Sequence, residues 1–143
     1  MPRGPLAMSR GLLGLALLLM AGAASACGGT VAAALTTPTT TSTDTFSGTV
    51  TRNGAFTYPF AAQQAGTVTA SYTSVGTDNT IALGLALGTW DGVACQILIV
   101  NDNATAGVVV TGVVSAAGSL CVRVFDVGYV VDPLSYEVKV VHP

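Results

Sequence analysis

The chain has 143 residues, of which 50% are hydrophobic and only 8% charged, and its formal net charge is −2. Beyond residue 26, three basic residues stand against seven acidic ones, a formal charge of −4. Proteins that bind nucleic acid, or that dock on anionic lipid by charge, need clustered Lys and Arg. The composition therefore argues against both kinds of partner.

The N-terminal segment has the three parts of an export signal. Arg3 and Arg10 form a basic region, and Leu12 to Met20 is an apolar run too short to span a bilayer comfortably. Small residues follow at Ala24 to Ala26, where a signal peptidase would cut. Residues 1–26 are therefore predicted to be a signal peptide.

The residues around this cleavage point, Ala24-Ser25-Ala26-Cys27, resemble the lipobox of bacterial lipoproteins. In such proteins the cysteine is acylated and becomes the first residue of the mature chain, so the resemblance implies a lipid on Cys27. We expect an exported lipoprotein of the cell membrane or outer membrane, with its domain facing the periplasm or the exterior. The alternative is ordinary signal-peptidase cleavage and a soluble secreted protein.

Residues 27–43 are rich in Ala and Thr, with one Pro and no charge. Such a composition is typical of a flexible spacer, which here would be a lipid-anchored linker. The remaining residues, 44–143, suffice for one domain with a modest core.

From residue 44 onward, apolar and polar residues alternate with period two, and turn residues recur at intervals near ten. This pattern predicts an all-β domain, an antiparallel β-sandwich of about eight strands. The predicted strands cover residues 45–52, 55–61, 66–75, 81–88, 95–101, 108–115, 120–127 and 135–142.

Four local features refine this prediction. Asn53-Gly54 suits a hairpin turn, and Pro59 places its strand at an edge or a bulge. Along Ile81 to Gly88, large residues alternate with Ala and Gly, so either a backbone or ligand approaches the small face closely, or bulky neighbours cover it. We favour coverage by neighbours. The apolar run from Cys95 to Asn101 (CQILIVN) is predicted to be a buried strand.

The chain contains three cysteines, and an odd number in an exported protein needs an explanation. If Cys27 carries lipid, Cys95 and Cys121 remain, and in an oxidising compartment they are predicted to form a disulfide. The alternatives are two unpaired buried cysteines, or a bond from Cys27 to one of them.

Several segments resemble the bacterial pre-peptidase C-terminal domain, over roughly residues 44–143. The segments are FSGTV, FTYPF, AGTVTASY, TWDG paired with Cys95, GSLCVRVFD and SYEVKVVHP. The resemblance implies a jelly-roll sandwich. Members of this family are found mostly as appendages of secreted hydrolases, and some bind polysaccharide, collagen or calcium.

Catalytic groups are scarce. His142 is the only histidine and lies next to the C-terminal residue, where fraying would spoil the positioning of a general base. Glu137 is the only glutamate, and no serine triad or facing pair of carboxylates has a sequence signature here. We therefore expect no enzymatic activity.

Three aspartates in predicted turns are candidates for a calcium site: Asp78, Asp91 and Asp102. The competing interpretation is that Asp and Asn occupy turns because they hydrogen-bond to their own backbone. The sequence favours that interpretation, because no loop has the dense alternation of acidic ligands found in calcium loops. No cofactor is therefore expected.

Flat aromatic side chains that stack on sugars are available at Tyr72, Trp90 and Tyr129. Trp90 and Tyr129 lie beside turns and are the better candidates for exposure. We expect a non-catalytic binding module that recognises polysaccharide or an extracellular protein. The alternative is a structural or interaction lipoprotein of the cell envelope with no small ligand.

Overall fold

Eight β-strands and no helix make up residues 40–143, the part of the chain that the computed structural model describes. Within this part, therefore, no helix could cross a membrane. The predicted signal peptide, Cys27 and residues 28–39 of the predicted linker lie outside the described residues. The strands are β1 (Ser42–Val50), β2 (Ala55–Ala62), β3 (Gly66–Val75), β4 (Leu83–Trp90), β5 (Cys95–Ala104), β6 (Val109–Val114), β7 (Gly118–Phe125) and β8 (Leu134–His142).

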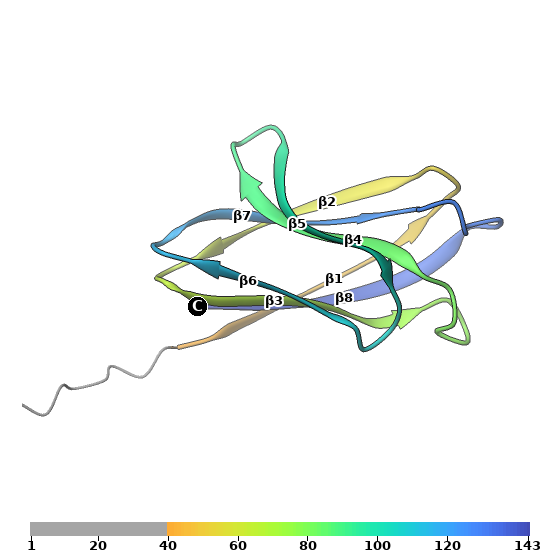
Figure 1. Cartoon of the computed structure of the whole chain (residues 1–143), viewed down its shortest axis with the longest axis horizontal. Helices are drawn as coiled ribbons and strands as arrows, with labels where there is room; N and C mark the ends of the chain where they lie inside the picture. The colour runs from red at the N-terminus through yellow and green to blue at the C-terminus, as the bar shows by residue number, and fades with distance from the viewer. Residues whose placement is uncertain (1–39) are drawn as a thin grey trace, which may run out of the picture. The chain divides into compact units, whose positions relative to one another are not determined.

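The strands form two antiparallel sheets of four, in the orders β1-β8-β3-β6 and β2-β7-β4-β5 (Figure 1). The first strand pairs with the last, the second with the seventh, the third with the sixth and the fourth with the fifth. A long four-stranded ribbon of antiparallel pairs that rolls up on itself produces this order, which is that of a jelly roll. The predicted jelly-roll sandwich is thus confirmed.

The core lies between the sheets and contains the residues that the alternation pointed inward. Val138 and Val140 of β8 are fully buried, and Tyr72 of β3 is only 1% exposed. The Tyr72 hydroxyl donates a hydrogen bond to the carbonyl oxygen of Gly84, 2.9 Å away, so its polar end is satisfied inside the core. Burial raises the pKa of this hydroxyl well above its ordinary value.

The Asn53-Gly54 turn differs from the prediction. Asn53 has a φ of 56°, the positive value that Asn tolerates, and the amide of Gly54 donates to the carbonyl of Thr51 at 2.8 Å. The strands on either side, however, belong to different sheets, so this turn is a crossover and not a hairpin. Period-two alternation alone cannot distinguish the two, because both join consecutive strands.

The four edge strands of the sandwich are β1, β6, β2 and β5. The prediction that Pro59 lies on an edge strand is confirmed, because β2 is the outer strand of its sheet. The prediction of a buried strand at Cys95 to Asn101 is wrong. β5 is also an outer strand, and its side chains from Gln96 to Val100 are exposed. β5 also extends to Ala104, so it includes Asp102, which was predicted to lie in a loop.

The glycines of β4 leave room for two different neighbours. A Cβ on Gly84 would lie 2.6 Å from Cδ2 of Phe125, so that ring covers the position. A Cβ on Gly88 would instead lie 2.7 Å from the carbonyl carbon of Gln96 and 3.0 Å from Cα of Ile97, both backbone atoms of β5. Coverage by a bulky neighbour therefore applies at Gly84, and close approach of another backbone applies at Gly88.

The predicted disulfide joins Cys95 of β5 to Cys121 of β7, with the two Cα atoms 5.8 Å apart. β4 lies between these strands, and strands two places apart in a sheet are normally about 9.6 Å apart. β5 therefore curls over the outer face of β4 at Gly88, and the tip of the β4–β5 hairpin projects from the sandwich (Figure 1). The bond confirms the predicted pairing and fixes this crossing.

Candidate binding surface

The two aromatic residues predicted to form a binding site do not lie together. Trp90 ends β4 and is half-buried beside the β4–β5 turn, where it pairs with Cys95. Tyr129 lies in the β7–β8 loop and lines one hollow together with Ile81 and Ala82, which precede the first residue of β4. At about 3.3 Å per residue, the length of β4 separates them by roughly 25 Å. They cannot form a single aromatic patch.

Tyr129 is 61% exposed and borders a shallow hollow of about 350 Å³. The other residues that line this hollow are Thr80, Ile81, Ala82 and Asn103. An exposed aromatic ring beside a hydroxyl and an amide is a combination that can stack on a sugar and hydrogen-bond to it. A predicted site residue, Tyr129, thus lines a concavity.

Asp126, which the sequence analysis did not single out, holds the loop that carries Tyr129. Its Oδ1 accepts hydrogen bonds from the backbone amides of Gly128, Tyr129 and Val130, and its Oδ2 accepts one from Asn53. Desolvation raises the pKa of Asp126, but these four donors outweigh it and hold the pKa below its ordinary value of 3.8. Gly128 has a φ of 104°, which permits the turn.

Tyr72, the third aromatic candidate, is excluded as a surface residue because it is buried in the core. Its ring lies 6.4 Å from that of Tyr136, in an edge-on arrangement typical of packed aromatic residues. Core packing, the commoner fate of an aromatic residue in a strand, applies here.

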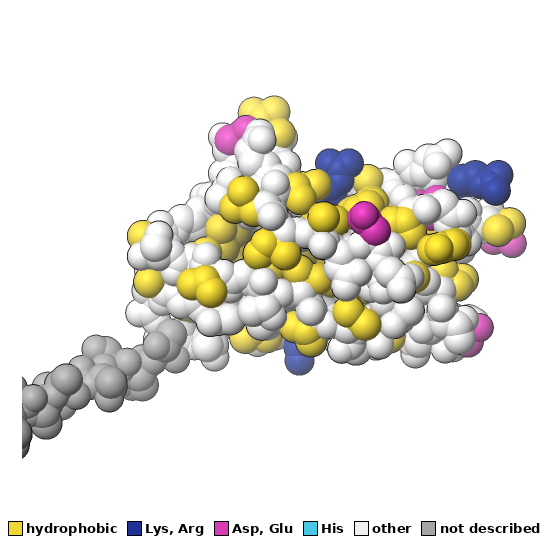
Figure 2. Space-filling view, in the orientation of Figure 1, with side chains coloured by type: hydrophobic (Ala, Val, Ile, Leu, Met, Phe, Trp, Pro, Cys, Tyr) yellow, Lys and Arg dark blue, Asp and Glu magenta, His cyan; other side chains and the backbone are white. Residues whose placement is uncertain are grey.

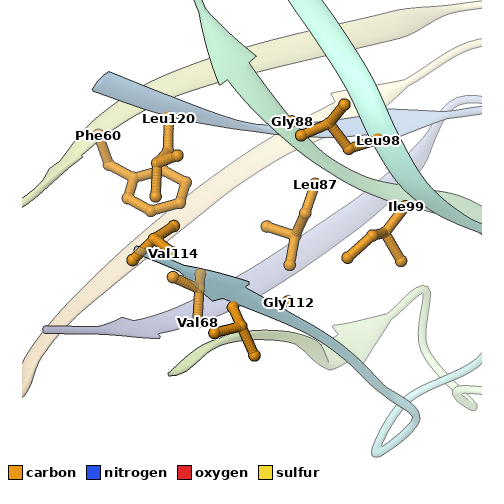
Figure 3. A pocket seen from close by; sticks show the side chains of 10 residues that line it. Phe60, Val68, Leu87, Gly88, Leu98, Ile99, Gly112, Val114 and Leu120 are labelled. Atoms are coloured by element: carbon orange, nitrogen blue, oxygen red, sulfur yellow. The ribbon is translucent and has the colours of Figure 1, made fainter. Parts of the chain in front are cut away.

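An apolar groove runs between β5 and β6, the outer strands of the two sheets on one side of the sandwich (Figure 3). Its floor is formed by core side chains, among them Phe60, Leu87 and Leu120, and its walls carry Leu98 and Val113. All ten lining residues are apolar or glycine. The groove encloses about 50 Å³, enough for the tip of one side chain.

The strands that border this groove also expose aliphatic side chains to solvent. Leu98 is 71% exposed and Val113 is 81% exposed. Figure 2 shows hydrophobic side chains, interspersed with other atoms, on the face of the molecule that carries β5 and β6. We define the β5–β6 face by its six exposed aliphatic residues, namely Ile97, Leu98, Ile99, Val100, Val109 and Val113. Exposed apolar side chains on neighbouring elements are typical of an interaction site.

The three calcium candidates do not form a cluster. The carboxylates of Asp78 and Asp91, which lie in turns, accept hydrogen bonds from nearby backbone amides. Asp78 accepts a hydrogen bond from the amide of Thr80 at 3.2 Å, and Asp91 accepts from the amides of Val93 and Ala94 at 2.8 and 2.7 Å. These backbone donors lower the pKa of both carboxyls. Within residues 40–143, no three acidic, His or Cys residues come close enough to hold a metal.

The expectation that His142 would fray is wrong. His142 is buried within β8, opposite Ser42 of β1, and its Nε2 lies 3.1 Å from Oδ2 of Asp44. The ring of Phe60 packs against it, with 5.1 Å between the ring centroids. Its Nδ1 is buried without a hydrogen-bond partner among the described residues. This environment anchors the last strand and offers a substrate no access to the ring.

No model of a known protein family matches the sequence, and no curated protein matches it. The resemblance to the pre-peptidase C-terminal domain therefore stays a prediction.

Proposed function

We propose that this protein is an exported, lipid-anchored, non-catalytic module that binds another protein at the cell envelope. The observation that carries this proposal is the β5–β6 face. Its six aliphatic side chains expose roughly as much surface as three complete side chains, on the order of 300 Å² of apolar surface. That is within the size range of the largest, often functional, patch on a soluble monomer.

The shape of this face favours a protein partner over a small ligand. Pockets for small ligands usually have volumes of about 300 to 1,000 Å³ and bury most of the ligand. The groove encloses only about 50 Å³, while the exposed side chains around it stand outward. A surface of this kind can contact another apolar surface and insert single side chains, as protein interfaces do.

The absence of catalysis is proposed from the chemistry of the site. The six residues of the β5–β6 face are aliphatic, and the residues that line the hollow beside Tyr129 include no His, Asp, Glu or Lys. His142 lies inside the sandwich against Asp44 and Phe60. The export and lipid parts of the proposal rest on the N-terminal sequence, above all on Cys27.

The binding role can be tested on intact cells that produce the protein with a photoreactive amino acid at one chosen position. Substitution at Leu98 should give covalent adducts with a partner protein after illumination. Substitution at Val131, which is 77% exposed in the β7–β8 loop and thus comparable in exposure, should not. Equal yields at both positions, or no adduct at Leu98, would refute the proposed role of this face.

Glycan binding is a second candidate, favoured by the hollow beside Tyr129. A glycan screen of the whole chain should then detect binding that Tyr129→Ala weakens about tenfold or more, because stacking on one aromatic ring is lost. Trp90→Ala is the matched control, since Trp90 lies at the other end of β4. Binding that is lost equally in both variants, or in neither, would contradict this assignment.

A further inference from the structure

β6 lacks the features that normally keep edge strands from pairing with other chains. Edge strands are commonly protected by a charge, a proline or a bulge. β1 carries Asp44, β2 carries Pro59, and β5 carries extra residues at Leu98 and near Asp102, where its register with β4 shifts. β6 reads VVTGVV, with no charge and no proline, and its register with β3 is regular throughout. Among the edges of the described sandwich, β6 is therefore open to pairing.

The sequence of β6 is suited to pairing with itself. Val109, Thr111 and Val113 are exposed on one face of the strand. If two copies of β6 pair antiparallel about a two-fold axis at Thr111, each Val113 lies opposite Val109 of the other copy. Thr111 then lies opposite its own copy. Valine–valine and threonine–threonine pairs are favourable neighbours across antiparallel strands.

The same two-fold pairing also covers the groove. Because the pleat continues across paired strands, the inner faces of both β6 strands point to the same side of the joined sheet. The β5 strands of both copies lie on that side, so Leu98 of one copy faces Leu98 of the other. The aliphatic side chains of β5 would then leave water together. One contact would thus account for both the open edge and the exposed apolar strand.

Charge presents no obstacle to this contact. β3 and β6, the two strands nearest the axis, contain no charged residue, so pairing brings no like charges together. The apolar area available, at most on the order of 300 Å² per copy because Val109 and Val113 lie on the outer face of β6, is smaller than the roughly 800 Å² per partner of a standard interface. Association should therefore be weak and concentration-dependent, and attachment to a common membrane would promote it.

We infer that β6 pairs with β6 of a second copy of this chain, so that two sandwiches share one continuous eight-stranded sheet. This inference rests on the proposed function, since it names the partner of the β5–β6 face. A different protein that adds a strand to β6 is the competing occupant, and the experiments below separate the two.

Charge reversal at the axis is the first test. Sedimentation of the full chain carrying Cys27→Ser, which removes the third thiol, should show dimers whose proportion rises with concentration. Thr111→Lys and Thr111→Glu should each weaken association more than about tenfold, because like charges would face each other. An equimolar mixture of the two variants should restore dimers. Thr45→Lys on β1, also exposed on an edge strand, is the matched control and should leave association unchanged.

Cross-linking at the axis is the second test. In the same background, Thr111→Cys should form a disulfide-linked dimer under mild oxidation, because paired Cα atoms lie about 4.5 to 5.5 Å apart. Thr45→Cys should not. Thr111→Cys that cross-links no better than Thr45→Cys, charge variants that the mixture fails to rescue, or assemblies larger than dimers would each overturn the inference. Melting curves verify that every variant is folded.

A monomeric wild-type chain that still gives Leu98 adducts with a different protein would overturn self-pairing and leave the proposed binding role intact. A monomeric chain without such adducts would overturn both. Dimers together with adducts between two copies of this chain would support both.

Discussion

Alanine at Gly88 should destabilise the fold because the strand above it cannot move away. The new Cβ would lie 2.7 Å from the Gln96 carbonyl carbon and 3.0 Å from Cα of Ile97, closer than such atoms normally approach. The bond from Cys95 to Cys121 holds β5 at this crossing. Overpacking costs about 1 to 3 kcal/mol, and the reduced freedom of the unfolded chain returns about 0.4 to 1 kcal/mol. The expected net loss is about 1 to 2 kcal/mol, or roughly 4 to 16 °C in Tm.

The disulfide should control the size of this loss. In a Cys95→Ala, Cys121→Ala background, β5 can lift from β4, so Gly88→Ala should cost little. Urea unfolding of the four chains gives a double-mutant cycle, in which we expect a coupling of about 1 kcal/mol or more between Gly88 and the bond. Additivity within about 0.5 kcal/mol would refute the crossing as the cause.

Gly118→Ala is the matched control for this cycle. Gly118 also lies in a strand of the same sheet, but a Cβ there would meet nothing within 4 Å. This substitution should be neutral or stabilise slightly, by up to about 1 kcal/mol. Equal losses of stability for Gly88→Ala and Gly118→Ala would show that the loss at Gly88 does not come from contact with the backbone of β5.

Three further predictions follow from the disulfide, the β7–β8 loop and the N-terminus. Removal of the Cys95–Cys121 bond should lower stability by about 3 to 4 kcal/mol, or roughly 12 to 30 °C in Tm by calorimetry, because 26 positions separate the two cysteines. Asp126→Asn should cost about 1 kcal/mol at neutral pH by urea unfolding. Because the folded pKa of Asp126 is lowered, its contribution is present above pH 3.8 and is lost as the pH falls through the folded pKa, so the difference from Asp126→Asn should shrink in acid. Mass spectrometry of the native protein should find an acylated Cys27, and Cys27→Ser should release the protein from membranes or block its processing; an unmodified cysteine there would contradict the anchor.

The existence of eight strands could be predicted from the sequence because alternation and turn residues are local signals. Pro59 even identified one edge strand, since a residue without an amide proton cannot bond on both sides. The order of the strands has no such local signal. Asn53-Gly54 shows this, because the same two residues suit a hairpin and the crossover that the fold contains.

The sequence did not reveal the β5–β6 face, because a buried strand and an exposed apolar edge strand have the same apolar composition. The run from Ile97 to Val100 is apolar without alternation, which is typical of a strand covered on both faces. Here β5 is an outer strand, and its apolar side chains face solvent and the groove. The absence of alternation was the available signal, but an exposed edge strand such as β5 shares it with a strand buried on both faces.

The separation of Trp90 from Tyr129 was missed for a related reason. Trp90 is the last residue of β4 and Tyr129 lies in the loop after β7, and both adjoin turns. β4 and β7 are antiparallel neighbours, so the ends of the two strands lie at opposite ends of the sheet. Knowledge of this pairing would have separated the two residues, but the pairing spans the whole domain and cannot be read from either turn.

The pairing of β1 with β8 places the two ends of the domain side by side. Ser42 lies opposite His142, so the backbone enters the sandwich where it leaves it. A short linker from Pro143 to Ser42 could therefore close the domain into a ring without disturbing either sheet. The ring could be opened at Val131, in the exposed loop between β7 and β8, to give a circular permutant with the same strand order in space. In such a permutant the chain termini lie in the β7–β8 loop. A domain attached to a surface through its terminus would then present the β5–β6 face in a different orientation.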